Sequence, residues 1–316
     1  LTLVQVNVII ESNICRLGGV LLKQEIFKGA GVAIITPYTE DGINFEELGR
    51  IIEDQIAGGT DAIIITGTTG ESATMTDDEH KSAIKYAVEK VAGRIPVIAG
   101  TGSNETDYAV KLSVYAEQVG ADALLVVTPY YNKCTQKGLV KHFTTIADAV
   151  NIPIILYNVP SRTGVNIQVP TFVELAKHPR IVAVKEASGD LSAVAKIRHA
   201  CGDELAIYSG NDDQIVPILS LGGYGVISVL SNVAPAMAHN ICQNYFDGKV
   251  KEAADMQIKA IDLINALFCE VNPIPVKVAM RKLGYAAGPL RLPLTEMEPE
   301  HEQQLEKALK AHGLIK

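Results

Sequence analysis

Tryptophan is absent from this chain of 316 residues, and aromatic residues make up only 5% of it. Cysteine is scarce as well, because the chain carries only five, scattered cysteines with no CxxC pair. This odd and scattered set argues against a disulfide framework or a cysteine-based zinc site and fits a reducing cytoplasm. The seven histidines lack the HxxH and HxxxH spacings. The sequence therefore offers no obvious ligands for a metal-dependent mechanism.

Strong charge and long apolar runs are also missing. The net charge of −8 is mild and argues against nucleic acid as the main partner. Near the N-terminus Val4, Val6, Val8 and Ile10 alternate with other residues as in a strand, but Glu11 interrupts this apolar pattern. The pattern is well short of the roughly 20 apolar residues that a membrane span needs. No basic segment precedes it, so we expect neither a membrane segment nor a signal peptide, and a cytoplasmic location.

What the chain does have is a repeated unit of a short apolar run, a polar turn and an amphipathic segment. Eight apolar runs recur, at Val32–Ile35, Ala62–Ile65, Pro96–Ala99, Ala123–Val127, Ile154–Tyr157, Ile181–Lys185, Leu205–Tyr208 and Val226–Val229. Eight strand–helix units with apolar strands predict an α/β fold, a closed (β/α)8 TIM barrel. An open doubly wound sheet is the alternative, but it usually carries a glycine-rich turn after its first strand, which here reads Thr-Pro-Tyr-Thr.

The region after the eighth unit predicts additional C-terminal helices, at about Lys251–Phe268, Pro273–Leu283 and Pro299–His312. The apolar face formed by Ile258, Ile261, Leu263, Ile264 and Leu267 requires a partner, either the barrel or another subunit. We expect an N-terminal extension over 1–28, a barrel over 29–247 and a helical region over 248–316.

Lys185 stands where the sixth apolar run should end. Burial of an ammonium group in an apolar wall is costly and favours the neutral amine. A neutral amine attacks carbonyl carbon, which is the first step of Schiff-base catalysis. A strand-terminal lysine that simply reaches water is the alternative, and the other strand ends must decide between the two interpretations.

In a (β/α)8 barrel the chemistry takes place at the carboxyl ends of the strands. The Gly67–Gly70 turn follows the second run and offers backbone N–H groups and two hydroxyls to a carboxylate. Tyr131 and Tyr157 provide hydroxyls that can relay protons. Arg162 can bind a carboxylate through two parallel hydrogen bonds. Each residue also has a purely structural interpretation, but together they predict one active site on this rim.

Six motifs lie at these strand ends: GTTGE at 67–71, TPYYN at 128–132, LYNVPSRTG at 156–164, VKEA at 184–187, SGND at 209–212 and GVISV at 225–229. In this order they resemble the dihydrodipicolinate synthase and N-acetylneuraminate lyase superfamily of class I aldolases. The resemblance runs from about Phe27 to the C-terminus. It implies a (β/α)8 barrel with a C-terminal helical region, usually a homotetramer built from two tight dimers.

The resemblance is closest to the dihydrodipicolinate synthase branch. It implies condensation of pyruvate with aspartate 4-semialdehyde in lysine and diaminopimelate biosynthesis, with no cofactor besides the covalent Schiff base. Arg162 favours this branch, because the sialate lyases tend to lack an arginine in that turn. The alternative enzyme is a pyruvate-dependent aldolase or lyase for a sugar acid of the 2-keto-3-deoxygluconate or N-acetylneuraminate type. A catalytically silent barrel retained as a binding protein is a further alternative, but every expected catalytic residue is present.

The resemblance also implies a role for each site residue. Lys185 forms the Schiff base, and Thr69, Tyr157 and Tyr131 form a proton relay that Tyr131 enters from a neighbouring subunit. The remaining residues bind substrate: Thr68 and Thr69 the pyruvate carboxylate, Arg162 the semialdehyde carboxylate, and Gly210 and Ile227 the substrates through backbone contacts.

Finally, the resemblance implies a pocket for lysine as an effector at the tight-dimer interface, formed by Ser72, Ala73, Asp77, His80, Asn104, Tyr108 and Tyr130. Tyr108 stands where lysine-sensitive relatives commonly carry a glutamate, and Asp77 where a histidine is common. Loss of the acid should weaken binding of the lysine ammonium, and a carboxylate nearby should restore only part of it. Alternatively, Asp77 simply begins a helix. We expect weak inhibition by lysine.

Overall fold

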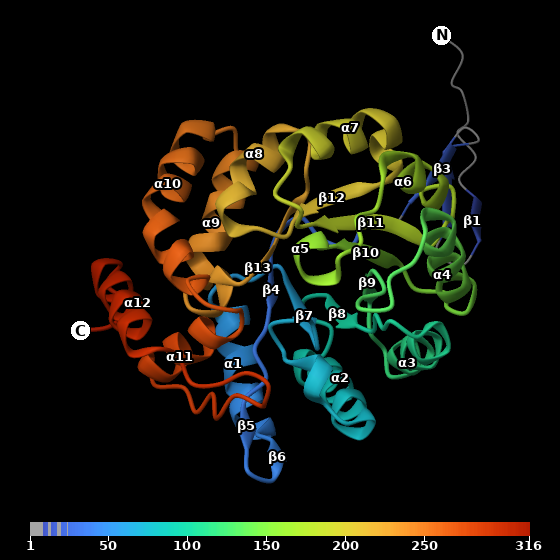
Figure 1. The fold of residues 1–316 in the computed structure, drawn as a ribbon. Helices are drawn as coiled ribbons and strands as arrows, with labels where there is room; N and C mark the ends of the chain where they lie inside the picture. The colour runs from blue at the N-terminus through green and yellow to red at the C-terminus, as the bar shows by residue number, and fades with distance from the viewer. Residues whose placement is uncertain (1–8, 12–13, 18–19, 24) are drawn as a thin grey trace.

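The computed structural model describes residues 9–11, 14–17, 20–23 and 25–316. Eight parallel strands close into a barrel in the spatial order β10-β11-β12-β13-β4-β7-β8-β9. Their bounds are β4 Gly29–Ala33, β7 Ala62–Ile65, β8 Val97–Gly100, β9 Ala123–Val127, β10 Ile154–Asn158, β11 Ile181–Glu186, β12 Ala206–Ser209 and β13 Gly225–Ser228. The predicted (β/α)8 barrel is therefore confirmed (Figure 1).

The first barrel strand is the one whose position the sequence misplaced. We expected it at Val32–Ile35, but β4 begins at Gly29. Gly29 and Gly31 have no apolar side chain, so they gave no strand signal in the sequence. The close packing around them nevertheless requires glycine. A Cβ on Gly31 would lie 2.6 Å from Ile64 Cδ1 and 2.9 Å from the Phe27 ring. Neighbouring side chains therefore fill the space that a larger residue would need.

Helices surround the strands: α1 Phe45–Ala57, α2 Asp77–Val91, α3 Thr106–Gln118, α4 Gln136–Asp148, α5 Pro160–Thr163, α6 Val169–Leu175, α7 Leu191–Cys201, α8 Ile215–Ser220 and α9 Pro235–Phe246. The N-cap of α2 is Thr76, which forms a capping box with Glu79. Asp77 is therefore the first residue of that helix and not its cap.

No helix in the described ranges is long and apolar enough to cross a membrane.

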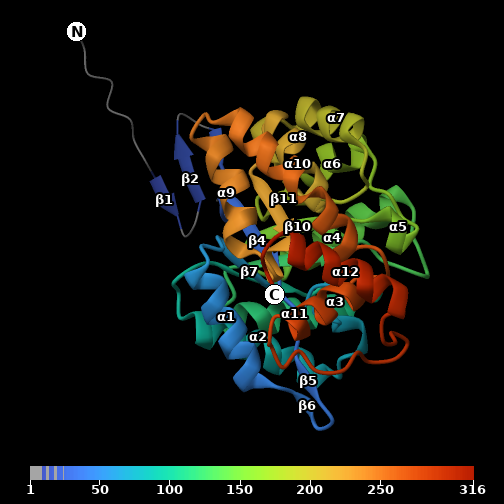
Figure 2. The ribbon, with the colours of Figure 1, turned by 90° about the vertical axis from the view of Figure 1, so that its left-hand side faces the viewer.

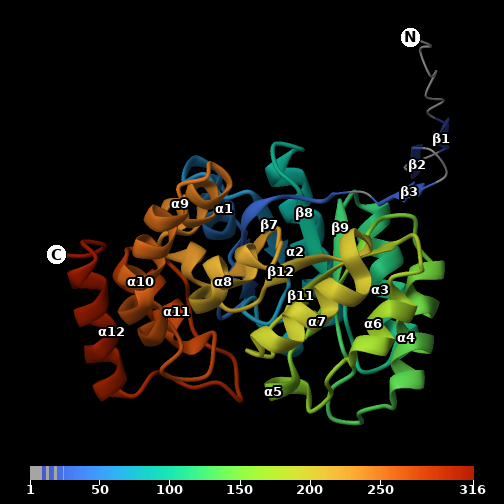
Figure 3. The same cartoon turned by 90° about the horizontal axis from the view of Figure 1, so that it is seen from above.

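The three C-terminal helices are α10 Val250–Leu267, α11 Ile274–Lys282 and α12 Pro299–Ala311. They gather on one side of the barrel (Figure 3). Leu263, Ile264 and Leu267 are buried as expected, whereas Ile258 is 69% exposed in the single chain. The expected partner for this face therefore covers only part of it.

Two small antiparallel sheets are separate from the barrel sheet. One joins β1 Ile9–Glu11, β2 Ile14–Leu17 and β3 Val20–Leu22, and Figure 2 shows β1 and β2 outside the ring of helices. The other is the hairpin of β5 Tyr38–Thr39 and β6 Gly42–Ile43. Of the expected alternating residues, Val4, Val6 and Val8 lie outside the described ranges. The division at residues 28 and 247 stays a prediction.

Side chains fill the interior of the barrel. The rings of Phe27 and Tyr208 stack with their centroids 4.4 Å apart, and the Tyr208 hydroxyl donates a hydrogen bond to the Phe27 carbonyl at 2.6 Å. Ile64, Ile98 and other apolar side chains pack around this pair. The barrel is thus a packed core, and ligands have room only at its ends.

Candidate active site

Lys185 lies inside the barrel near the carboxyl end of β11. Side chains alternate along a strand, so Ala183 and Lys185 face the interior while Val184 packs outward. Lys185 is only 6% exposed. Its partner in the register of the adjacent strand β10 is Tyr157, and Lys185 Nζ lies 4.4 Å from the centre of the Tyr157 ring. The structure thus places the predicted amine beside one predicted relay tyrosine.

Glu186, the next residue of β11, is buried on the opposite face of the strand. Its carboxylate accepts hydrogen bonds from the Ser188 N–H at 2.7 Å and from Asn158 Nδ2 at 2.9 Å. Burial raises the pKa of Glu186, while these donors oppose the rise. The contact between Asn158 and Glu186 joins the carboxyl ends of β10 and β11. Sequence reasoning gave Asn158 and Glu186 no role, because the pairing of two strands is needed to bring them together.

The turn over 67–70 stands between two residues with positive φ, Thr66 at 54° and Glu71 at 57°. Such values are costly for residues with a Cβ and persist where surrounding contacts fix them. Thr69 is buried, and its Oγ1 accepts a hydrogen bond from Asn272 Nδ2 at 3.0 Å. Thr68 is half-buried. Two residues from outside the turn, Asn272 and Glu71, therefore matter for its shape.

Glu71 forms a buried ion pair with Lys277 of α11, which the sequence did not reveal. Lys277 Nζ donates to Glu71 Oε1 and to the Pro289 carbonyl, both at 2.7 Å. The side chains of this pair are 0% and 1% exposed. Burial lowers the pKa of Lys277, and the Glu71 carboxylate opposes this. The ion pair fastens the 67–70 turn to the C-terminal helices.

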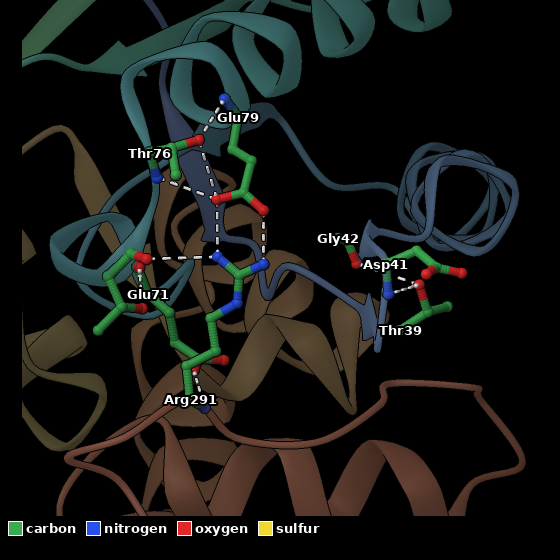
Figure 4. A network of polar contacts seen from close by, with 8 residues as sticks. Thr39, Asp41, Gly42, Glu71, Thr76, Glu79 and Arg291 are labelled. Carbon is green, nitrogen blue, oxygen red and sulfur yellow. Dashed lines mark hydrogen bonds and ion pairs between the residues drawn. The ribbon is translucent and has the colours of Figure 1, made fainter.

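Arg291 adds a second connection between the same regions. Figure 4 shows its guanidinium facing the Glu79 carboxylate, and Nη1 donates to Oε2 at 2.7 Å while Nη2 donates to Oε1. Nη1 also donates to the Thr74 carbonyl at 3.3 Å. The Arg291 N–H also donates to Glu71 Oε2 at 3.2 Å. The guanidinium lowers the pKa of Glu79 to about 2. The start of α2 is thereby fixed to the segment before α12.

Arg162 lies on the short helix α5, directly after β10. Its Nη2 donates to the backbone carbonyl of Asn272 at 3.2 Å. The rest of its side chain is exposed. One residue, Asn272, thus contacts both Thr69 and Arg162.

A cavity of about 570 Å³ opens above the ends of β7, β8, β9 and β10. Seven of the site residues predicted from the sequence line this cavity: Thr68, Ser72, Ala73, His80, Tyr108, Tyr130 and Arg162. Asn272 and Pro273 also line it. Thr68 and Arg162, predicted for substrate binding, therefore border the same space as five residues predicted for lysine binding. Lys185, Tyr157 and Thr69 are not among the residues that line it.

Two of the predicted lysine-site residues do not line this cavity. Asp77 accepts hydrogen bonds from the Tyr108 hydroxyl at 3.1 Å and from Lys81 Nζ at 2.6 Å. The carbonyl of Asn104 accepts from Asn132 Nδ2 at 2.9 Å.

Burial and the Asp77 carboxylate raise the pKa of Tyr108 to about 12, so its hydroxyl remains protonated at neutral pH. His80 is buried with Nε2 2.8 Å from the Gly100 carbonyl.

The remaining predicted site residues, Tyr131, Gly210 and Ile227, differ in their exposure and in their surroundings. Tyr131 is 92% exposed with a φ of 70°, so the single chain does not bring it to Lys185. Gly210 has no room for a side chain, because a Cβ would lie 2.5 Å from Ala187 Cβ, and its N–H donates to the Glu186 carbonyl at 2.7 Å. Ile227 is fully buried in the barrel interior.

Across the part of the chain that the structure describes, no three His, Cys, Asp or Glu side chains cluster in a way that could bind a metal ion.

Comparison with known proteins agrees with this geometry. The model of the dihydrodipicolinate synthetase family matches residues 26–312. A 4-hydroxy-tetrahydrodipicolinate synthase of Clostridium perfringens is 60% identical over 291 residues, which cover 92% of this chain and all of the relative. These matches confirm the prediction of the dihydrodipicolinate synthase branch, a lyase of the class I aldolase type, over the sugar-acid alternative.

Solved structures agree as well. A lysine-bound dihydrodipicolinate synthase from Cyanidioschyzon merolae has a TM-score of 0.90 and 41% identity, covering 92% of this chain and 100% of that one. A structure described as the first monomeric dihydrodipicolinate synthase variant has the same TM-score and 40% identity, covering 92% of this chain and 98% of that one. Enzymes of this family form a Schiff base between pyruvate and a lysine and need no cofactor. The chain therefore belongs to the dihydrodipicolinate synthetase family.

Proposed function

We propose that Lys185 is the amine through which this chain condenses pyruvate with L-aspartate 4-semialdehyde to form 4-hydroxy-tetrahydrodipicolinate. The observation that carries the proposal is the burial of Lys185 beside Tyr157, near the carboxyl ends of β11 and β10. Within the described residues no carboxylate forms an ion pair with Lys185 Nζ. The buried carboxylate of Asp212 interacts with the charge of Lys185, but not through a direct ion pair. An amine without a direct partner is available for chemistry.

The reaction begins when Lys185 Nζ attacks C2 of pyruvate. The amine gives up two protons, the carbonyl oxygen leaves as water, and a C=N bond forms. The Schiff-base nitrogen takes up a proton and the methyl group loses one, which converts the Schiff base into an enamine. The enamine carbon bonds to the aldehyde carbon of the second substrate, whose oxygen takes up a proton. The amino group of that substrate then attacks C2 and displaces Lys185, which closes the ring.

The protons in these steps need a carrier. Thr69, Tyr157 and Tyr131 serve as the relay in this proposal, because hydroxyl groups both donate and accept. Two observations support it: Tyr157 adjoins Lys185, and Thr69 is fixed by Asn272. Thr68 and Thr69 bind the pyruvate carboxylate through the turn, and Gly210 and Ile227 set the shape of the site.

Arg162 binds the carboxylate of the semialdehyde. Its guanidinium lines the cavity, and only one of its N–H groups is used by the Asn272 carbonyl. The remaining donors can form the parallel pair of hydrogen bonds that a carboxylate accepts.

Substrate use tests the function. We expect pyruvate consumption with aspartate 4-semialdehyde, and no release of pyruvate from 2-keto-3-deoxygluconate or N-acetylneuraminate at the same enzyme concentration. Comparable turnover of either sugar acid would contradict the proposal. A chain that binds pyruvate but turns over no aldehyde would support the silent barrel instead.

The proposal includes assembly into a homotetramer of two tight dimers. It is supported by the 92% exposure and positive φ of Tyr131, which suit a side chain that completes a neighbour's site. Sedimentation at assay concentration should give at least a dimer. A fully active monomer would refute this role of Tyr131, and the monomeric relative makes that outcome worth measuring.

Lysine is the proposed effector. The relative from Cyanidioschyzon merolae binds lysine, and five of the seven residues predicted for such a pocket line the cavity here. The contact of Tyr108 with Asp77 supports weak binding, because the Asp77 carboxylate already accepts hydrogen bonds from Tyr108 and Lys81.

A cytoplasmic location is also part of the proposal. Cys134, Cys201, Cys242 and Cys269 are free thiols, as a reducing compartment would allow. Recovery of the protein from the cytoplasmic fraction of its source cells would support this location, and recovery from a secreted fraction would contradict it.

A further inference from the structure

Asn272 contacts two of the proposed functional residues through different atoms. Its side-chain Nδ2 donates to Thr69 Oγ1 at 3.0 Å. Its backbone carbonyl accepts from Arg162 Nη2 at 3.2 Å. Asn272 is only 6% exposed, and it lines the cavity together with Thr68 and Arg162. A single residue of the C-terminal region thus contacts the relay and the second substrate's arginine.

The chemistry of the contact with Thr69 is directional. An amide nitrogen donates hydrogen bonds and does not accept them. Thr69 Oγ1 must therefore act as the acceptor in this contact, and its own O–H proton is left to point to another partner. In the relay that partner is the Tyr157 hydroxyl or a substrate oxygen.

We propose that Asn272 is a positioning residue that sets the direction of the Thr69 O–H bond in the proton relay. The inference rests on the proposed function, because it assumes that Thr69 carries protons for the Lys185 chemistry. Asn272 acts only through Thr69, while its carbonyl holds Arg162 independently of the side chain.

The substitution Asn272→Asp tests direction with almost no change of shape. An ionised carboxylate only accepts, so it turns the Thr69 proton toward residue 272 and away from the relay. Asn272→Ala is the matched control, because it removes the donor without adding an acceptor. Both variants retain the backbone carbonyl, so the contact with Arg162 persists.

We expect kcat at pH 8 to fall about 10-fold in Asn272→Ala and about 100-fold in Asn272→Asp. The KM for aspartate semialdehyde should stay within about twofold in both variants, because Arg162 keeps its partner. General loosening of the site would instead raise KM and affect both variants alike.

The pH profile distinguishes direction from mere packing. A protonated carboxyl group can donate, so Asn272→Asp should recover activity relative to Asn272→Ala as the pH falls from 8 to 6. Burial favours the protonated form of an aspartate in this position. The titratable and charged side chains that line the cavity with residue 272 are Glu71, His80, Tyr108, Tyr130 and Arg162. They are common to both variants, so the ratio of the two activities isolates residue 272.

The outcomes separate this inference from the proposed function. If Asn272→Asp equals or exceeds Asn272→Ala at pH 8, or if their ratio does not change with pH, the inference is wrong. If the unmodified enzyme forms no adduct with pyruvate at Lys185, the proposed function itself fails. Should Asn272→Asp not fold, Asn272→Ala alone decides, because a higher KM with unchanged kcat would contradict a role in the relay.

Discussion

Two buried lysines at the same end of the barrel differ in what surrounds them. Lys277 is 0% exposed and has a carboxylate, a carbonyl and the face of the Tyr38 ring around its Nζ. Lys185 is 6% exposed, and the contact that the described residues give its Nζ is the Tyr157 ring. The first lysine has direct partners for its charge, whereas the second has no direct hydrogen-bond or ion-pair partner among the described residues.

This difference separates stability from catalysis. Breaking a buried ion pair from one side leaves an uncompensated charge, which is strongly destabilising. Removing an amine that lacks such a partner should cost little stability and nearly all activity. Lys277 fastens the turn that is proposed to bind substrate, and Lys185 is the amine proposed to perform the chemistry beside that turn.

Substitution of Lys185 should give the largest effect. Lys185→Met keeps the length and apolar contacts of the side chain but removes the nucleophile. We expect kcat to fall by at least about 10³-fold, with a melting temperature no lower than that of the unmodified chain. Steady-state kinetics and thermal unfolding would measure both. A variant with less than about tenfold loss of kcat would contradict the assignment of Lys185.

Substitution of Lys277 should give the opposite pattern. Lys277→Met leaves Glu71 buried without its counterion, so we expect a loss of about 3–5 kcal/mol in the free energy of unfolding. Denaturant titration would measure it. Lys277→Met combined with Glu71→Gln removes both charges and is the matched control.

The double variant should recover part of that stability, because no isolated charge remains. If the loss of stability in the double variant equals the sum of the losses in Lys277→Met and in Glu71→Gln, the ion pair is not the reason for the stability. Equal losses of stability in Lys185→Met and Lys277→Met would remove the distinction between the two lysines.

Arg162 provides a third, exposed cation for this comparison. Arg162→Ala should lower kcat/KM for aspartate semialdehyde about 30- to 150-fold, since a charge-assisted pair of hydrogen bonds contributes on the order of 2–3 kcal/mol. Formation of the Schiff base with pyruvate should change much less. Arg162→Lys, which keeps the charge but not the planar fork, should be intermediate. Equal effects on both substrates would give Arg162 a structural role only.

The smallest expected effect concerns lysine as an effector. Tyr108→Glu places a second carboxylate near Asp77, and an ammonium group would relieve their repulsion. We expect lysine to bind about three- to tenfold more tightly in calorimetric titration. Tyr108→Phe, which removes only the hydroxyl, is the control. Tight binding by the unmodified chain, or no gain from Tyr108→Glu, would show that this pocket works differently.

The sequence predicted the barrel because its eight apolar runs report burial, which is what makes a strand. It misplaced β4, because glycines that permit close packing carry no apolar signal. It predicted Lys185 and Tyr157 through their places at strand ends. It missed Asn272 and the pair of Glu71 with Lys277, because these contacts join residues about 200 positions apart. Local patterns cannot report such pairing.

The most direct test of the central claim is covalent trapping with pyruvate and borohydride, followed by peptide mapping. Borohydride reduces the C=N bond, so the substrate stays attached to the amine that formed it. The account predicts one adduct per chain on the peptide that contains Lys185, with loss of activity and no adduct in Lys185→Met. An adduct on another lysine, Lys277 included, would contradict the account.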